Sequence, residues 1–137
     1  MTIDLEKLVR EFHNVYGVPI KDYPTLPEHA RRDLRIKLLK EEFQEYLDAE
    51  QDNNIHAIAD GLIDLVYIAI GTCLEYGIPF NSIFREVHMS NMSKLDDKGD
   101  PIKREDGKVL KGPSYFKPRI PAILNMKKLN YDKRNEK

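Results

Sequence analysis

Apolar residues in the first 95 positions recur at the three- and four-residue spacing of α-helices, in four runs separated by turn residues. Gly17 ends the first run, and the polar residues 52–54 separate the second run from the third. Gly77 stops the third run, and Pro79 opens the fourth. The pattern therefore predicts a helical domain over residues 1–95. The expected N-terminal caps of its first three helices are Thr2, Thr25 and one residue of 52–54.

The third run, residues 55–74, is apolar on nearly every side, which is the pattern of a helix buried all round. Four helices of this length supply few neighbours for such a helix within one chain. We therefore expect helices of a second copy to complete the bundle, in a homodimer or a dimer of dimers. The expected fold class is all-α, with four to five helices and a core completed by dimerisation.

Four carboxylates occupy positions where the helical pattern predicts a core. Glu42 and Glu45 fall on the apolar face of the second run, and Asp60 and Asp64 lie one turn apart in the third. Burying an ionised carboxylate without a partner costs several kcal/mol. Residues 41–64 contain eight acidic residues and no Lys or Arg, so no local ion pair neutralises these four. The pattern therefore predicts a bound divalent cation.

The donor atoms indicate which cation to expect. All four side chains offer oxygen, which favours Mg²⁺ or Mn²⁺ over zinc. His56 and Cys73 lie nearby but not at the ligand spacing of a zinc site. The alternative is an ordinary acidic surface stripe. It would account for Glu41, Glu45 and Asp48 but not for the two aspartates, because the third run has no polar face.

The composition describes one small soluble protein of 137 residues, with 41% hydrophobic and 33% charged residues. A net charge of -1 gives no reason to expect nucleic acid as a partner. The single cysteine excludes an internal disulfide and favours a reducing compartment. Because the sequence has neither a basic-then-apolar leader nor an uninterrupted apolar span, we expect a cytoplasmic protein that does not cross a membrane.

Residues 96–137 form a second region, a basic and irregular C-terminal tail rich in turn residues. We expect it to pack on the helical domain of residues 1–95 or on the partner subunit. Residues 93–137 contain thirteen Lys or Arg and seven Asp or Glu. The pairs Asp-Pro at 100–101 and Asp-Gly at 106–107 predict a small hairpin. A basic region beside an acid-only stretch suits a site that holds a cation on one side and phosphates on the other.

Four sequence blocks occur in a fixed order along the chain. They are EExxE at residues 41–45, DGLIDLVYIAIG from Asp60, EVHMSNMSKL from Glu86 and REDGKVLKGPSY from Arg104. EExxE alone occurs by chance on many helices, whereas the ordered set is specific. With these blocks the chain resembles the all-α nucleoside triphosphate pyrophosphohydrolases, which include the MazG-type enzymes, the dimeric dUTPases and the phosphoribosyl-ATP pyrophosphohydrolases. The resemblance is greatest to the single-domain MazG-like branch.

The resemblance implies a MazG-like bundle that binds Mg²⁺ or Mn²⁺ and cleaves a nucleoside triphosphate between the α and β phosphates. Carried over by position, the catalytic and metal-binding carboxylates are Glu41, Glu42, Glu45 and Asp64. Glu41 would be either a ligand or the base that activates the attacking water. The superfamily's second motif is usually ExxD, and its Glu position here is Gly61. Asp60 is a candidate substitute, which leaves the number of bound ions open.

The substrate expected from the resemblance is a pyrimidine deoxynucleotide such as dUTP, or a non-standard nucleoside triphosphate. The candidate contacts for its phosphates or base are His13, Asn91, Lys94, Lys108, Lys111 and Tyr115. A non-catalytic helical module that binds metal or nucleotide stays open as the alternative, and absence of pyrophosphate release would favour it. A phosphatase of the haloacid dehalogenase type is excluded, because the chain has no apolar strand ending in DxDxT or DxDxV.

Overall fold

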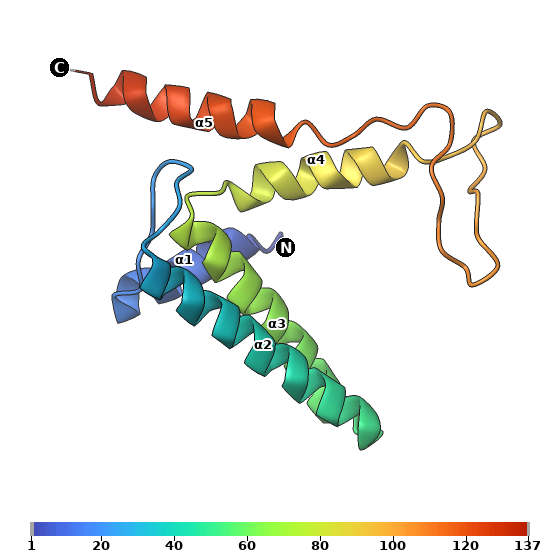
Figure 1. Cartoon of the computed structure of the whole chain (residues 1–137), viewed down its shortest axis with the longest axis horizontal. Helices are drawn as coiled ribbons and strands as arrows, with labels where there is room; N and C mark the ends of the chain where they lie inside the picture. The colour runs from blue at the N-terminus through green and yellow to red at the C-terminus, as the bar shows by residue number, and fades with distance from the viewer. Residues whose placement is uncertain (1, 137) are drawn as a thin grey trace. The chain divides into compact units, whose positions relative to one another are not determined.

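The structure is a computed structural model that describes residues 2–136. Those residues form five α-helices and no named strand, so the all-α prediction is confirmed (Figure 1). The chain divides into two compact units, Met1–Phe80 and Asn81–Lys137. This division lies upstream of the boundary that we expected between residues 95 and 96.

The first unit is built from α1 (Leu5–Tyr16), α2 (His29–Gln51) and α3 (Ile55–Glu75). The helices α2 and α3 lie side by side as an antiparallel pair (Figure 1), and α1 packs on α3. Asn54 caps α3, as expected: its side-chain oxygen accepts hydrogen bonds from the N–H groups of residues 56 and 57. This short capped connection brings the acidic stretch of α2 next to α3.

The core of this unit lies where α1 meets the second half of α3. Val9, Ile70 and Leu74 are at most 2% exposed and form its centre. The partly buried side chains that pack against them are Ile20, Tyr67 and Phe80. The linker between α1 and α2 crosses the end of α3, where the Lys21 N–H donates to the Leu74 carbonyl. These contacts hold the C-terminal half of α3 against α1 and the linker.

Two of the expected helix caps are wrong. Asp4, not Thr2, caps α1, because its side chain accepts a hydrogen bond from the Lys7 N–H at 3.1 Å. Thr25 caps no helix: its N–H donates to the Tyr76 carbonyl and ties the linker to the end of α3. At α1 a local bond to residue 7 makes Asp4 the cap, whereas at residue 25 a contact with the end of α3 takes the place of a cap, and no side chain caps α2.

Helix α3 is apolar, yet much of it stays exposed within one chain. Its buried residues are Gly61, Ile70, Gly71, Leu74 and Glu75. Ile63 is 66% exposed, and only 22% of the helix's most apolar window is buried. By length and composition α3 could also cross a membrane, a test that core helices of soluble proteins pass as well. One chain therefore leaves much of α3 uncovered, as expected from the sequence, and its cover by a second copy stays a prediction.

The second unit holds most of α4 (Phe80–Met92), a turn-rich segment and α5 (Ile120–Arg134). The expected hairpin forms, since Lys103 and Val109 make an isolated antiparallel bridge around the Asp-Gly turn at 106–107. Helix α5 lies in the region that the sequence indicated as an irregular tail. None of its residues is buried, and its apolar side chains do not gather on one face, so no periodic pattern marked it.

Candidate functional site

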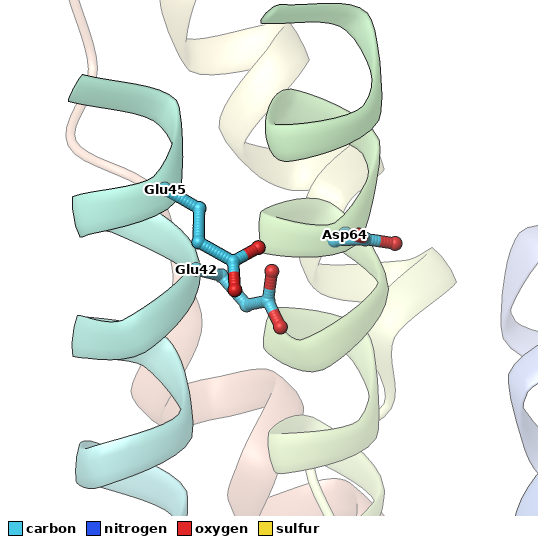
Figure 2. A group of neighbouring side chains, drawn as sticks. All are labelled: Glu42, Glu45 and Asp64. Atoms are coloured by element: carbon cyan, nitrogen blue, oxygen red, sulfur yellow. The ribbon is translucent and has the colours of Figure 1, made fainter. Parts of the chain in front are cut away.

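Three carboxylates from two helices converge between α2 and α3. Glu42 and Glu45 share one side of α2, because residues three apart are neighbours on a helix surface. Figure 2 shows both projecting from α2 towards α3, which carries Asp64. One carboxylate oxygen from each of the three lies within 4.8 Å of the other two. The fold thus brings together three of the residues that the sequence singled out as metal ligands.

Glu42 is the member of this triad with the least compensated charge. Its Oε2 atom is buried and has no hydrogen-bond partner among the described residues. Burial raises the pKa of the Glu42 carboxyl, and the charges of Glu45 and Asp64 raise it further, followed by a side-chain hydrogen bond with Glu45 and the charge of Asp60. A positive charge placed among these oxygens would remove this penalty.

Another buried carboxylate of the same unit is neutralised by the chain's own residues. Glu75 is 1% exposed and forms ion pairs with Arg31 at 2.8 Å and with Arg35 at 2.9 Å. Within residues 2–136, no ion pair involves any carboxylate of the triad. The first unit therefore supplies cationic partners for Glu75 and, among its described residues, none for the triad.

Contacts on both sides of the triad fix α2 against α3. The Arg35 guanidinium donates from Nη2 to the Ile68 carbonyl at 2.8 Å and from Nε to Thr72 Oγ1 at 3.0 Å. Further along the pair, Gly61 lies against α2, where a Cβ would come within 3.1 Å of Tyr46 Cα. A side chain at this position would require α2 and α3 to shift by a few tenths of an ångström, so glycine at the Glu position of ExxD favours this close crossing.

The other two predicted carboxylates lie outside the triad. Glu41 lines an open depression on α2 together with Lys37, Lys40 and Gln44. Asp60 is exposed, and its charge contributes to the raised pKa of Glu42 without its oxygens joining the triad. Their assigned roles as base or additional ligand stay predictions.

His13 is an interior side chain of the first unit. It is 2% exposed, and its Nδ1 lies 3.1 Å from the Pro19 carbonyl oxygen. Burial lowers the pKa of the His13 imidazole, the bond to Pro19 opposes this, and the charge of Arg35 lowers it again. A neutral, buried imidazole bonded to the backbone has a structural role, so its position does not support the expected contact with a nucleotide base.

The remaining predicted substrate contacts belong to the second unit. Asn91 lies in α4, Lys94 follows that helix, and Lys108, Lys111 and Tyr115 lie in the turn-rich segment. Lys111 Nζ stands 4.7 Å from the centroid of the Tyr115 ring, which is a cation–π arrangement. Their roles in binding phosphates stay predictions.

Sequence reasoning missed the polar side chains that are buried away from the triad. Arg35 and Glu75 are buried in the first unit, and Glu86 and Ser90 in the second. The available signal was the same one that identified the triad, a polar residue at an apolar helical position. Glu75 stands directly after the apolar run of residues 55–74, and Arg35, Glu86 and Ser90 lie outside the acidic stretch in which that signal was strongest.

Comparisons with known proteins indicate the protein family to which this chain belongs. Residues 9–91, more than half of the chain, match the family model described as phosphoribosyl-ATP pyrophosphohydrolase. An uncharacterized protein of Acanthamoeba polyphaga mimivirus is 28% identical over an alignment of 99 positions, which covers 68% of this chain and 36% of that protein. The chain thus spans little more than a third of the length of that relative.

A solved structure of a proposed NTP pyrophosphohydrolase from Exiguobacterium sp. 255-15 is 22% identical to this chain. The superposition covers 99% of this chain and 100% of that structure, with a TM-score of 0.49. A similarity of this size is too low to carry an argument by itself. The family match, in contrast, includes all three residues of the triad. The chain belongs to the phosphoribosyl-ATP pyrophosphohydrolase family, within the all-α NTP pyrophosphohydrolase superfamily.

Proposed function

We propose that the protein is a metal-dependent nucleoside triphosphate pyrophosphohydrolase. It would cleave between the α and β phosphates and release a nucleoside monophosphate and pyrophosphate. The observation that carries the proposal is the triad of Glu42, Glu45 and Asp64, whose oxygens meet within 4.8 Å and form no ion pair with any residue that the structure describes. Membership of the family supports a hydrolase of phosphoric anhydrides.

The triad fits Mg²⁺ or Mn²⁺ in donor type and in spacing. All three donors are carboxylate oxygens, which these hard cations prefer. Oxygens on opposite sides of Mg²⁺ stand about 4.2 Å apart, twice the usual metal–oxygen distance of about 2.1 Å. At most one pair of three oxygens can take opposite positions and neighbouring positions stand about 3.0 Å apart, so oxygens within 4.8 Å of one another would draw together by up to about 1–2 Å through side-chain rotation. The buried, unpartnered Oε2 of Glu42 would gain the partner that the protein does not supply.

The residues of the triad would hold the cation from two helices whose crossing is fixed by close packing. When bound, Mg²⁺ or Mn²⁺ neutralises phosphate charge and lowers the pKa of a water. Attack of water on the α-phosphorus breaks its bond to the bridging oxygen, and the electron pair leaves with pyrophosphate. The attacking water must lose a proton. Glu45 is exposed to solvent and Glu41 faces the neighbouring depression, so these two are the candidate acceptors.

As the substrate we propose a pyrimidine deoxynucleotide such as dUTP, or a non-standard nucleoside triphosphate. The resemblance in sequence supports this choice. Contacts with the phosphates are assigned to Asn91, Lys94, Lys108, Lys111 and Tyr115. Lysine ammonium groups and an amide suit phosphate oxygens, and Lys108, Lys111 and Tyr115 belong to the turn-rich segment that follows α4.

We further propose that the active form is a homodimer or a dimer of dimers in the cytoplasm. An apolar groove between α1 and α3 supports this proposal. Its lining includes Leu5, Leu8, Ile63 and Val66, whose exposed fractions run from 46% to 66%. Apolar surface of this kind on a soluble protein marks a contact with another protein. The single cysteine supports a reducing compartment.

A screen of nucleoside triphosphates with Mg²⁺ or Mn²⁺, with the products resolved, tests the proposed reaction. We expect monophosphate plus pyrophosphate from at least one nucleotide, dependent on the cation and abolished by Glu42→Gln. Diphosphate plus phosphate would overturn the assigned bond. Binding of metal with no product from any nucleotide would favour the alternative, a non-catalytic helical module that binds metal or nucleotide.

A further inference from the structure

Two buried side chains of the second unit face the turn-rich segment from one side of α4. Glu86 is 8% exposed and Ser90 is 1% exposed, and they lie one turn apart on the helix. Within the described part of this unit they are the buried residues, and both are polar. The segment is therefore held by hydrogen bonds and an ion pair, and not by a buried apolar cluster.

Both side chains bind the end of the segment. Ser90 Oγ donates to the Phe116 carbonyl at 2.7 Å, and the Phe116 N–H donates to Ser93 Oγ at 3.1 Å. Ser93 Oγ in turn donates to the Ser90 carbonyl at 2.6 Å. Glu86 Oε1 accepts from the backbone N–H of Arg119 at 2.9 Å and from its Nε at 2.8 Å. Two successive turns of α4 are thus tied to residues 116 and 119.

The two ends of the segment also meet each other. Gly112 packs against the Leu95 carbonyl so closely that a Cβ at residue 112 would overlap it. The hydrogen bonds from Arg119 hold the pKa of the Glu86 carboxyl below its usual range, so Glu86 is ionised at neutral pH. Residues 96–111 therefore extend from a base that is fixed on both sides.

We propose that Glu86 and Ser90 are positioning residues that clamp the base of the segment 94–115 and hold its lysines and Tyr115 in the arrangement that binds substrate phosphates. This inference rests on the proposed function, which assigns phosphate contacts to that segment. Neither residue is assigned a contact with the nucleotide. A segment that is already in its binding arrangement has the higher apparent affinity, because apparent affinity falls with the fraction of competent molecules.

The clamp therefore acts on KM and not on kcat, since the carboxylate triad belongs to the other unit. The test compares Ser90→Ala and Glu86→Gln with wild type, and uses Ser82→Ala, an exposed serine of the same helix, as the matched control. Each protein is assayed for turnover and for its affinity towards an α,β-imido analogue of the preferred triphosphate, which is not hydrolysed. Mn²⁺ affinity and amide exchange at residues 116 and 119 are measured alongside.

We expect KM and the dissociation constant of the analogue to rise about 10-fold in both clamp variants. We also expect kcat and Mn²⁺ affinity to stay within about 2-fold, and exchange at residues 116 and 119 to become faster. Ser82→Ala should match wild type. Glu86→Gln keeps the side-chain volume, so it remains informative should Ser90→Ala fail to fold.

Unchanged KM and analogue affinity in variants with faster exchange would overturn the clamp and leave the proposed function intact. A loss confined to kcat would also overturn it. A wild-type protein that binds the analogue without hydrolysing the natural nucleotide would refute the proposed function, and the affinity comparison would still decide on the clamp. A wild-type protein that binds no nucleotide would overturn both.

Discussion

Replacing Glu42 by Gln tests the electrostatics of the triad, because it removes one negative charge and keeps the side-chain volume. The oxygens of Glu45 and Asp64 lie within 4.8 Å of Glu42. At that distance two unit charges repel each other by about 3.5 kcal/mol at an effective dielectric constant of about 20, and by about 0.9 kcal/mol in bulk water. Glu45 is exposed, so solvent screening favours the lower value, about 1 kcal/mol for each neighbour.

Without metal, Glu42→Gln should therefore raise the free energy of unfolding by about 1–2 kcal/mol at neutral pH. The pKa of Glu42 is raised in the folded protein, so its ionisation destabilises the fold above that pKa. As the pH falls from the raised pKa to the ordinary carboxyl value of 4.5, the wild type regains this stability. Urea denaturation at neutral pH and below that ordinary value should show the variant's advantage only at neutral pH.

The same variant should lose its response to metal. A cation at a hundred times its Kd stabilises the wild type by about 2.7 kcal/mol, and Glu42→Gln should show little of this gain. Glu11→Gln, which removes an exposed carboxylate from α1, is the matched control and should respond as the wild type does. A Glu42→Gln protein that is less stable than wild type without metal, and that still shows the full metal shift, would refute the reasoning.

Three further substitutions test the packing and the chemistry. Glu75→Ala leaves Arg35 buried without its partner and should cost about 3–5 kcal/mol in urea denaturation, and a loss below about 1 kcal/mol would contradict the assigned ion pair. Gly61→Ala should destabilise by about 1–3 kcal/mol, because its Cβ would stand 3.1 Å from Tyr46 Cα, whereas an unhindered helix would gain about 1 kcal/mol. If Glu41 accepts the proton, Glu41→Gln should lower kcat roughly 10²-fold with Mn²⁺ affinity unchanged. Unchanged turnover would remove Glu41 from the mechanism, and loss of metal binding would make it a ligand.

The positions of α1 to α4 and of the triad followed from local periodicity, whereas α5 has no periodic pattern and was missed. A helix repeats every 3.6 residues, so the faces of α2 and α3 could be drawn from the sequence, and acids on those faces were visible as exceptions. The convergence of Glu42, Glu45 and Asp64 needed only that these two neighbouring helices pack together. A short, capped connection between them made that packing predictable.

Features that depend on distant contacts were not predictable in this way. Arg35 and Glu75 form an ion pair although they lie forty residues apart in the sequence, and the sequence of neither helix alone indicates the partner. The reason for Gly61 is the backbone of another helix, which no periodic pattern contains. The cover of α3 is a related case: the sequence shows that this helix is too apolar for one chain to cover, but not which surface covers it.

Anomalous diffraction from crystals grown with Mn²⁺ and a non-hydrolysable nucleoside triphosphate tests the central claim most directly. The account predicts a manganese peak about 2.1 Å from oxygens of Glu42, Glu45 and Asp64, with a phosphate oxygen of the nucleotide on the same ion. A bound nucleotide with no manganese at these three carboxylates would contradict the account.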